Sequence, residues 1–384
     1  MWFRTFAIGF VALAVALLVA CQAQGKHQPS SPFSTPSGEI VYVVDNVSVT
    51  TYTIDPGTLE PSTVGGSVGL LPTSSFMLQL VPSPDDHFLY VLWFDTQQQE
   101  HLSSYATDLS GVPQIPPVQT LDVSSLSQLN IHPSGKFAYA MELDNSTGAY
   151  ISAILLFHIT ALGILQLDAN VQGRYGPAPF PTLLYGVSPD GTQIYLTSED
   201  ANGPLYWESA LNGQNGTLAA NDLLFRPPIR DSVVLGATLV VDYQSALNYS
   251  QPGYVNVLLN EPEPPQQLIH CVGTMLGACG TATNVLLDPS GNYLFLTDPA
   301  SQQVHVAGID LSANVITDTG NFFPFTAETP GFTFSPDGTL VYAWLARDHS
   351  LHIYRFDQTG GSLTESGASI PLSKSVGFLP ALRR

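Results

Sequence analysis

The sequence predicts an all-β fold, namely a seven-bladed β-propeller with four-stranded antiparallel blades. Three observations support this prediction. A Pro-Asp-Gly or Pro-Ser-Gly turn recurs along the chain at intervals of about 50 residues, a spacing typical of propeller blades. Each unit holds four short apolar runs separated by turn residues, which indicates four strands. No apolar period of 3.6 residues, which would indicate an amphipathic helix, follows residue 35.

The count of seven comes from six clear copies of the turn and one degenerate copy. The prolines of the clear copies are at positions 36, 84, 133, 189, 289 and 336. The interval from Pro189 to Pro289 is about twice the others and contains "DSVVLGATLVVDY", with Gly236 but no proline. The strand after most turns carries an aromatic residue between apolar ones, for example Tyr42, Tyr90 and Tyr195.

Each turn residue has a mechanical role. Proline presets φ, the Asp or Ser side chain accepts a hydrogen bond from the nearby backbone, and glycine adopts a positive φ. The second copy has Asp86 where the others have glycine, and Asp tolerates this conformation. We predict that each turn joins the innermost strand of a unit to the second strand.

The two ends of the fold are predicted to pair. Residues before Pro36 are too rich in Pro and Ser to form the innermost strand of the first blade. The segment "SVGFLPALRR" near the C-terminus resembles the strand that precedes the other turns. We therefore expect residues 376–380 to pair with residues 39–45 and remove an open sheet edge.

Residues 1–35 are predicted to direct and tether the chain, and residues 36–384 to form the propeller. Arg4 and the apolar run 6–20 indicate a signal peptide over residues 1–20. The sequence Leu-Val-Ala-Cys ending at Cys21 resembles the lipobox of bacterial lipoproteins, which implies cleavage and acylation at Cys21. Residues 21–35 then form a flexible tether to a membrane of the bacterial cell envelope. A secreted protein with an unmodified Cys21 is the alternative.

Cys271 and Cys279 are the other two cysteines of the chain. An exported chain meets an oxidising compartment, so a disulfide between them is predicted. Closing so short a loop contributes about 2–3 kcal/mol in the chain-entropy model. A zinc site is less favoured, because two thiols and the neighbouring His270 fall short of a structural zinc set.

Charge and motifs exclude several function classes. The formal net charge of −20 disfavours nucleic acid and anionic lipid surfaces as partners. The sequence has no phosphate-binding loop, no dinucleotide fingerprint and no His-Glu-x-x-His motif, so we expect no cofactor and no metal. A monomer is expected.

The repeat resembles a known family. The pattern of an apolar residue, Pro-x-Gly and an aromatic strand, followed by a polar loop and a strand such as "LHIYRFD", resembles the lactonase-type seven-bladed propellers. These include propeller-type 6-phosphogluconolactonases and surface proteins with YVTN repeats; WD40-type repeats are shorter. The resemblance covers residues 36–380 and rests on turn and strand residues. It implies lactone hydrolysis for some members and binding or scaffolding for others.

An acidic rim is predicted where the second strand of each unit ends. Counting from the turns places carboxylates at this edge, where they could act as acid–base residues or bind a ligand. The alternative is that they cap the turn backbone. The candidates are Glu142 and Asp298 as catalytic residues, Asp45 and Asp200 as ligand-binding residues, and Asp95, Asp242 and Asp348 as near-equivalents.

Basic residues number only 11, so their placement matters. Guanidinium groups bind phosphate or carboxylate in a bidentate manner. Arginines in the connections between strands could reach the same rim, although a solvated loop position is the alternative for each. The candidates for ligand binding are Arg174, Arg230 and Arg347, with Arg226 in a similar connection.

Two functions remain open. The first is an envelope-anchored module that binds a protein or glycan through the channel face of the propeller. The second is a hydrolase of sugar lactones, which only the family resemblance favours. Export argues against a phosphorylated lactone, because that substrate is cytoplasmic.

Overall fold

The computed structural model describes residues 39–225, 232–271 and 284–383, each range with short gaps, and only the backbone between 219 and 285. Every regular element in these ranges is a strand. No described helix is long and apolar enough to cross a membrane. The predicted signal peptide, Cys21 and the tether lie outside the described residues. The fold is an all-β propeller of small, mainly antiparallel sheets.

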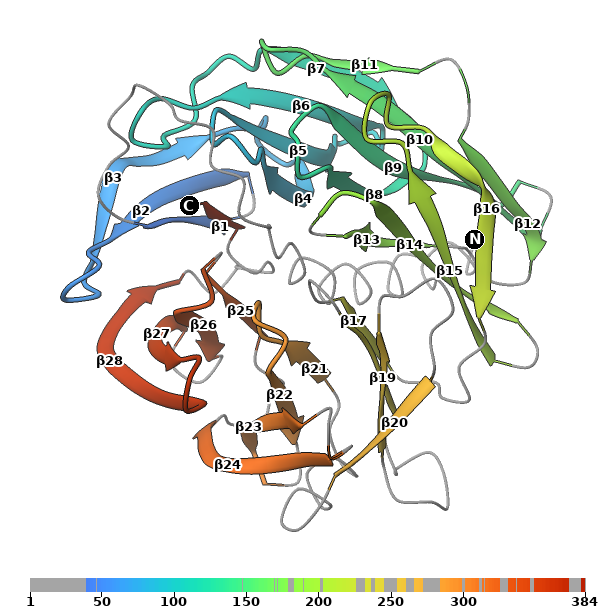
Figure 1. Cartoon of the computed structure of the whole chain (residues 1–384). Coiled ribbons are helices and arrows are strands. Elements are labelled where there is room, and N and C mark those ends of the chain that lie inside the picture. Colours follow the sequence, from blue (N-terminus) through green and yellow to red (C-terminus); the bar gives the residue numbers. More distant parts are fainter. Residues whose placement is uncertain are drawn as a thin grey trace. The chain divides into compact units, whose positions relative to one another are not determined.

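The chain divides into two compact units, which are coloured along the sequence in Figure 1. Unit 1 comprises Met1–Gly57, Pro61–Arg226 and Ser375–Arg384, and unit 2 comprises Thr58–Glu60 and Pro227–Lys374.

The described residues of unit 1 form four sheets. Sheet 1 has the order β29 (Ala381–Arg383), β1 (Glu39–Asp45), β2 (Ser48–Ile54) and β3 (Pro61–Gly69). Sheet 2 contains β4 (Phe76–Pro82), β5 (Phe88–Phe94), β6 (Glu100–Ala106) and β7 (Gln119–Val123). Sheet 3 contains β8 (Leu126–Ile131), β9 (Phe137–Asp144) and β10 (Tyr150–Ile159), with β11 (Leu165–Leu167) and β12 (Gly173–Ala178) both paired to β10. Sheet 4 contains β13 (Leu183–Val187), β14 (Gln193–Asp200), β15 (Gly203–Leu211) and β16 (Leu218–Phe225).

Unit 2 contains two sheets. Sheet 5 has eight strands in the order β17 (Ser232–Leu235), β18 (Leu239–Gln244), β19 (Tyr254–Leu259), β20 (Gln266–Cys271), β24 (Val315–Pro324), β23 (Gln303–Asp310), β22 (Tyr293–Asp298) and β21 (Asn284–Leu287). Sheet 6 contains β25 (Gly331–Phe334), β26 (Leu340–Leu345), β27 (Ser350–Asp357) and β28 (Ser362–Pro371).

The described residues form six sheets, so the prediction of seven separate blades is wrong. The strands of the degenerate repeat and of the repeat after it form one sheet. The outermost strands of the two repeats, β20 and β24, pair in parallel through His270 with Val315 and Cys271 with Ile316. This parallel pairing joins two antiparallel sets of four strands, β17–β20 and β21–β24.

Pairing of the C-terminus with the first strand is confirmed, but the residues differ from those predicted. Strand β29 pairs with β1 through Tyr42 with Ala381, Val41 with Leu382 and Ile40 with Arg383. The predicted partners, residues 376–380, lie outside the described residues. The observed pairing begins directly after Pro380 in the sequence, and proline has no N–H to donate to a ladder.

The recurring turn joins the innermost strand to the second strand, as predicted. Asp86 and its described glycine equivalents, Gly135, Gly191, Gly291 and Gly338, have a positive φ between 64° and 76°. The Asp side chain accepts a hydrogen bond from the amide two residues later, for example from Thr192 to Asp190 at 3.0 Å. A serine before the proline adds a second bond, because Ser188 Oγ donates to Asp190 Oδ1 at 2.6 Å.

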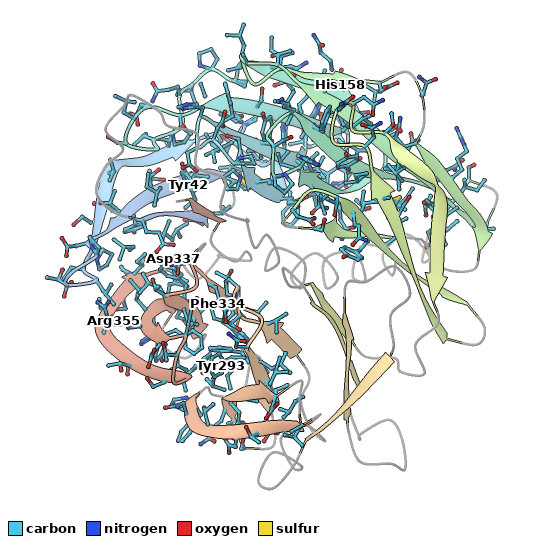
Figure 2. All side chains as sticks on the ribbon, viewed as in Figure 1. Tyr42, His158, Tyr293, Phe334, Asp337 and Arg355 are labelled. Carbon is cyan, nitrogen blue, oxygen red and sulfur yellow. The ribbon has the colours of Figure 1, made fainter. Side chains whose placement is uncertain are left out.

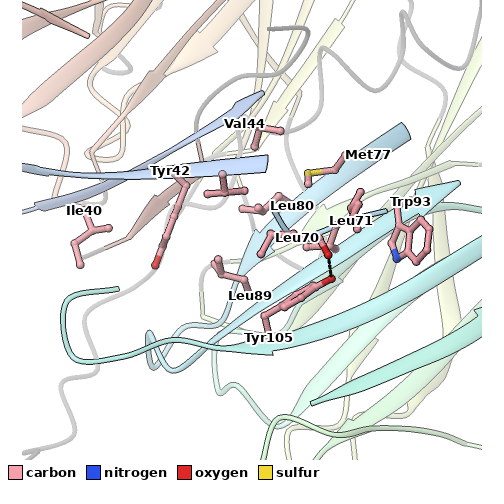
Figure 3. Packing of buried hydrophobic residues seen from close by; sticks show 12 residues of the cluster. Ile40, Tyr42, Val44, Leu70, Leu71, Met77, Leu80, Leu89, Trp93 and Tyr105 are labelled. Atoms are coloured by element: carbon pink, nitrogen blue, oxygen red, sulfur yellow. Dashed lines mark hydrogen bonds between the residues drawn. The ribbon is translucent and has the colours of Figure 1, made fainter. Parts of the chain in front are cut away.

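Apolar side chains fill the spaces between neighbouring sheets within each unit. Figure 3 shows the cluster between sheets 1 and 2, where the Tyr105 hydroxyl donates to Leu70 O at 2.6 Å. Similar clusters join sheets 2 and 3 and sheets 3 and 4. In unit 2, Phe295 of sheet 5 meets Phe334 of sheet 6 edge to face, with ring centroids 4.8 Å apart. Figure 2 labels Phe334.

Candidate functional site

Three described acidic residues at or just after the ends of second strands cap the turns that follow. Asp95 accepts hydrogen bonds from the amides of Gln97 and Gln99 at 2.9 and 2.8 Å. Asp144, which ends β9, accepts from the amide of Ser146 at 2.8 Å. Asp298 is 6% exposed and accepts from the amide of Ser301 at 3.3 Å. These three carboxylates therefore cap the backbone of their own turns.

The hydrogen bonds at these caps favour the charged carboxylate. Partial desolvation acts against ionisation of Asp95, but the bonds from Gln99, His101 and Gln97 outweigh it and hold its pKa below the ordinary value. The amide of Ser146 lowers the pKa of Asp144 in the same way. Both groups are thus ionised turn caps at neutral pH.

The other predicted residues are placed as follows. Asp45 ends β1 opposite Ser48, Asp200 ends β14 opposite Gly203, and Asp242 lies on β18 opposite Val233. Cys271 ends β20, and the predicted disulfide is untested because Cys279 lies outside the described residues. Also outside them are Arg226, Arg230, Arg347 and Asp348. The predicted catalytic pair is divided between the units, with Glu142 in unit 1 and Asp298 in unit 2.

The structure brings two predicted residues, Glu142 and Arg174, to the same row of sheet 3. Glu142 on β9 is opposite Ala153 on β10, and Ala153 is also opposite Arg174 on β12. Residues opposite each other in an antiparallel pair project from the same face. Glu142 is half-buried and Arg174 is exposed. A carboxylate and a guanidinium therefore flank a small residue.

This row belongs to the face of sheet 3 that packs against sheet 2. Ala138 and Ala140 lie four and two residues before Glu142 on β9, so they share its face of the strand. Both belong to the apolar cluster between these two sheets. Leu126 on β8 is opposite Glu142 and belongs to the same cluster. The row from Leu126 through Glu142 and Ala153 to Arg174 thus crosses four strands at one edge of the interface between sheets 2 and 3.

Glu100, which the sequence analysis missed, lies at the same edge. It is 3% exposed, and its Oε2 accepts a hydrogen bond from the amide of Leu126 at 2.7 Å. Burial raises the pKa of Glu100 to about 7, although bonds from the amides of Leu126 and Ser125 and the nearby His101 act in the opposite direction. The only signal in the sequence was an acidic residue at the start of the strand "EHLSSYA".

Among the described residues, no group of three or more His, Cys, Asp or Glu side chains is arranged to hold a metal ion.

No protein-family model matches the sequence, and no curated protein is similar to it in sequence. Solved structures do share its fold. A protein from Bacteroides uniformis, provisionally described as a 6-phosphogluconolactonase, is 16% identical with a TM-score of 0.64, over 91% of this chain and 100% of the other. A protein from Bacteroides fragilis with the same provisional description is 17% identical with a TM-score of 0.61, over 92% and 99%.

The periplasmic gluconolactonase of Pseudomonas aeruginosa also has this fold. It is 14% identical with a TM-score of 0.59, over 90% of this chain and 98% of the other. At such identities the likeness defines the fold alone. The resemblance to lactonase-type propellers is confirmed at that level: the chain has the fold of proteins described as lactonases.

Proposed function

We propose that the protein is a hydrolase of sugar lactones held at the bacterial cell envelope by acylated Cys21. The observation that carries this proposal is the row on sheet 3 in which Glu142 and Arg174 flank Ala153. Two strand spacings separate the outer members of the row, which corresponds to about 9–10 Å between their backbones.

Each residue of the row has a chemical role in lactone opening. Glu142 acts as the general base that removes a proton from the attacking water. Arg174 binds the carbonyl oxygen as it gains negative charge, and then the carboxylate of the product. Glu100 is a positioning residue, because its bond to the Leu126 amide holds the strand opposite Glu142.

The similar structures support sugar lactones as the proposed substrate class and the cell envelope as the proposed location. One of the similar structures is a periplasmic gluconolactonase, and two are provisionally described as 6-phosphogluconolactonases. The export signal predicted over residues 1–20 favours an unphosphorylated lactone, because sugar phosphates are cytoplasmic.

The test is hydrolysis of gluconolactone and related sugar lactones by the purified mature protein, followed as acid release. Glu142→Gln should lower kcat/KM by about 100-fold or more, the contribution of a general base. Arg174→Gln should raise KM and lower kcat. The matched control is Asp144→Asn, which removes the negative charge of a turn cap two residues along the same strand and should change kcat little. Hydrolysis that is unchanged in Glu142→Gln would refute the assigned site.

A noncatalytic binding module is the second candidate. The observation that favours it is the use of Asp95, Asp144 and Asp298 as turn caps, which leaves these carboxylates engaged by their own backbone. In that case the purified protein hydrolyses no lactone and retains a glycan or an envelope protein in a binding assay. Incorporation of labelled fatty acid into the wild-type chain but not into Cys21→Ser tests the anchor.

A further inference from the structure

Three side chains of sheet 6 form a connected hydrogen-bond series. Ser350 Oγ lies 3.0 Å from His352 Nε2, and His352 Nδ1 lies 3.1 Å from Glu365 Oε1. Ser350 and His352 are two residues apart on β27, so both project from the same face of the strand. Glu365 comes from the neighbouring strand β28, where the register shifts between His352 and Tyr354.

This arrangement has the connectivity of a serine nucleophile, its base and an orienting acid. A hydroxyl on one ring nitrogen and a carboxylate on the other keep the proton on Nδ1, and Nε2 is left to accept from the hydroxyl. Proteins of unrelated folds use this series to attack ester carbonyls, and it is identified by geometry and not by sequence position.

Two other histidines at the start of third strands lack this connectivity. His305 on β23 has both partners on Nε2, with Ser301 Oγ at 3.2 Å and Asp298 Oδ2 at 3.9 Å. His101 on β6 lies between two carboxylates, Asp122 Oδ1 at 2.9 Å and Asp95 Oδ2 at 3.4 Å. Of these three histidines, only His352 joins a hydroxyl on Nε2 to a carboxylate on Nδ1.

The three groups are increasingly exposed along the series. Ser350 is 8% exposed, the His352 side chain 13%, and the Glu365 side chain 53%. The nucleophile is thus largely desolvated, whereas the orienting carboxylate reaches solvent. Ser350 is the first residue of its strand, directly after His349, whose φ of 53° belongs to the hairpin turn.

We propose that Ser350, His352 and Glu365 form an acyl-transfer site that takes carboxylic esters through a covalent acyl-enzyme. Ser350 and His352 are its catalytic residues, and Glu365 is a positioning residue. The site lies in unit 2 and does not depend on the lactone site proposed for Glu142 and Arg174 in unit 1. Its substrate class is small open-chain carboxylic esters.

The bond changes balance without any co-reactant other than water. Ser350 Oγ forms a bond to the carbonyl carbon while His352 Nε2 takes the hydroxyl proton, and the carbonyl electron pair moves onto oxygen. The tetrahedral intermediate expels the alkoxide, which takes the proton from His352. Water then attacks the acyl-serine with His352 as base. The bond between the acyl carbon and Oγ breaks, and Ser350 regains a proton.

The test is labelling by a fluorescent fluorophosphonate, which phosphonylates activated serines. The wild-type protein should be labelled, and Ser350→Ala should not. His352→Gln should slow labelling by about 100-fold or more, as removal of a general base does, and Glu365→Gln should slow it less. The matched control is Ser301→Ala, which removes the serine on His305 and should be labelled like wild type.

Peptide mapping of the labelled wild-type protein keeps the test independent of variant folding. Trypsin releases residues 348–355, and Ser350 is the only serine of that peptide. An adduct at Ser350 supports the proposal. No labelling, labelling at another serine, or equal labelling of wild type and His352→Gln would overturn it.

The labelling experiment and the lactone assay test the two proposed sites independently. Glu142→Gln should be labelled at the wild-type rate even though it loses lactone hydrolysis. Labelling at Ser350 without any lactone hydrolysis would support the acyl-transfer site and reject the proposed function. Lactone hydrolysis without labelling would reject the acyl-transfer site alone.

Discussion

Tyrosine hydroxyls join neighbouring sheets of unit 1 at equivalent positions of the repeat. Tyr42 of sheet 1 donates to Gly111 O in the last turn of sheet 2, and Tyr139 of sheet 3 donates to Gly216 O in the last turn of sheet 4, both at 2.8 Å. Tyr90 occupies the same position in sheet 2, but its buried hydroxyl has no hydrogen-bond partner. One residue type at one repeat position therefore has two different energetic roles.

The two roles predict opposite effects of the same substitution. Tyr139→Phe should lower the free energy of unfolding by about 1–2 kcal/mol, because it removes a bond and leaves Gly216 O without its donor. Tyr90→Phe should be neutral or slightly stabilising, because it removes a buried hydroxyl that has no partner. Urea unfolding of the two variants measures the difference. Equal losses in both variants would contradict the assignment.

Residue-level chemistry was only partly predictable from the sequence. The turn spacing identified Glu142 and Asp298 as acidic residues at strand ends, and Arg174 in a connection. That Glu142 and Arg174 share a row depends on the register of β9, β10 and β12, which spacing alone does not encode. His352 and Glu365 lie together where the register shifts between β27 and β28, and this shift leaves no trace in the hydropathy pattern.

At the scale of elements, the recurring turn tolerates exchange of its polar residues. In three copies a serine precedes the proline and an aspartate follows it, as in Ser335 and Asp337, whose side chains are 2.7 Å apart. In the copy at Pro289 the order is reversed: Asp288 precedes the proline and Ser290 follows it, and the Ser290 hydroxyl donates to Asp288. A hydroxyl donor and a carboxylate acceptor suffice, in either order. The sequence predicted the turn, but not that its side chains bond to each other across the proline.

Neighbouring turns also contact each other. A comparison of two glycines distinguishes the energy of this contact from the backbone strain of a positive φ. Gly135 and Gly191 have nearly the same φ, 69° and 72°. A Cβ at Gly191 would lie 2.5 Å from the His132 ring, whereas a Cβ at Gly135 would lie 3.9 Å from Pro84. His132 is held there by a bond between its Nε2 and Gly191 O at 2.9 Å.

Alanine at both positions should therefore give unequal losses of stability. Gly135→Ala should cost about 1–2 kcal/mol, the penalty for a left-handed L-residue. Gly191→Ala should cost about 1–3 kcal/mol more, because the added methyl group overpacks the His132 ring. Thermal and urea unfolding of both variants measure the gap. If the two alanines cost the same, the contact between turns carries no energy.

At the scale of the whole molecule, the all-β class and the closing contact followed from the repeat, whereas the number of sheets did not. The sequence showed a degenerate fifth unit, and the structure merges its strands with those of the next unit through β20 and β24. Two residue pairs make this junction. Outer strands carry the least regular patterns of each repeat, so their pairing partners were not predictable.

The pairing of β29 with β1 joins the two ends of the described chain, and its removal should affect the whole of unit 1. Truncation after Pro380 deletes the strand and leaves β1 as an open edge with unpaired N–H and C=O groups. We expect a loss of about 2 kcal/mol or more in the free energy of unfolding, because the buried Ile40, Val41 and Tyr42 lose their neighbour. Concentration-dependent association should accompany this loss, because an open edge templates pairing with another chain.

The control for this truncation is deletion of Arg384 alone, which lies beyond the ladder formed by Ala381, Leu382 and Arg383. It should unfold like the full chain and show the same light scattering as the full chain. Urea unfolding with light scattering at two protein concentrations distinguishes the variants. If truncation after Pro380 and deletion of Arg384 behave alike, the three-residue strand does not stabilise the sheet and unit 1 must hold its first blade by apolar packing against sheet 2 alone.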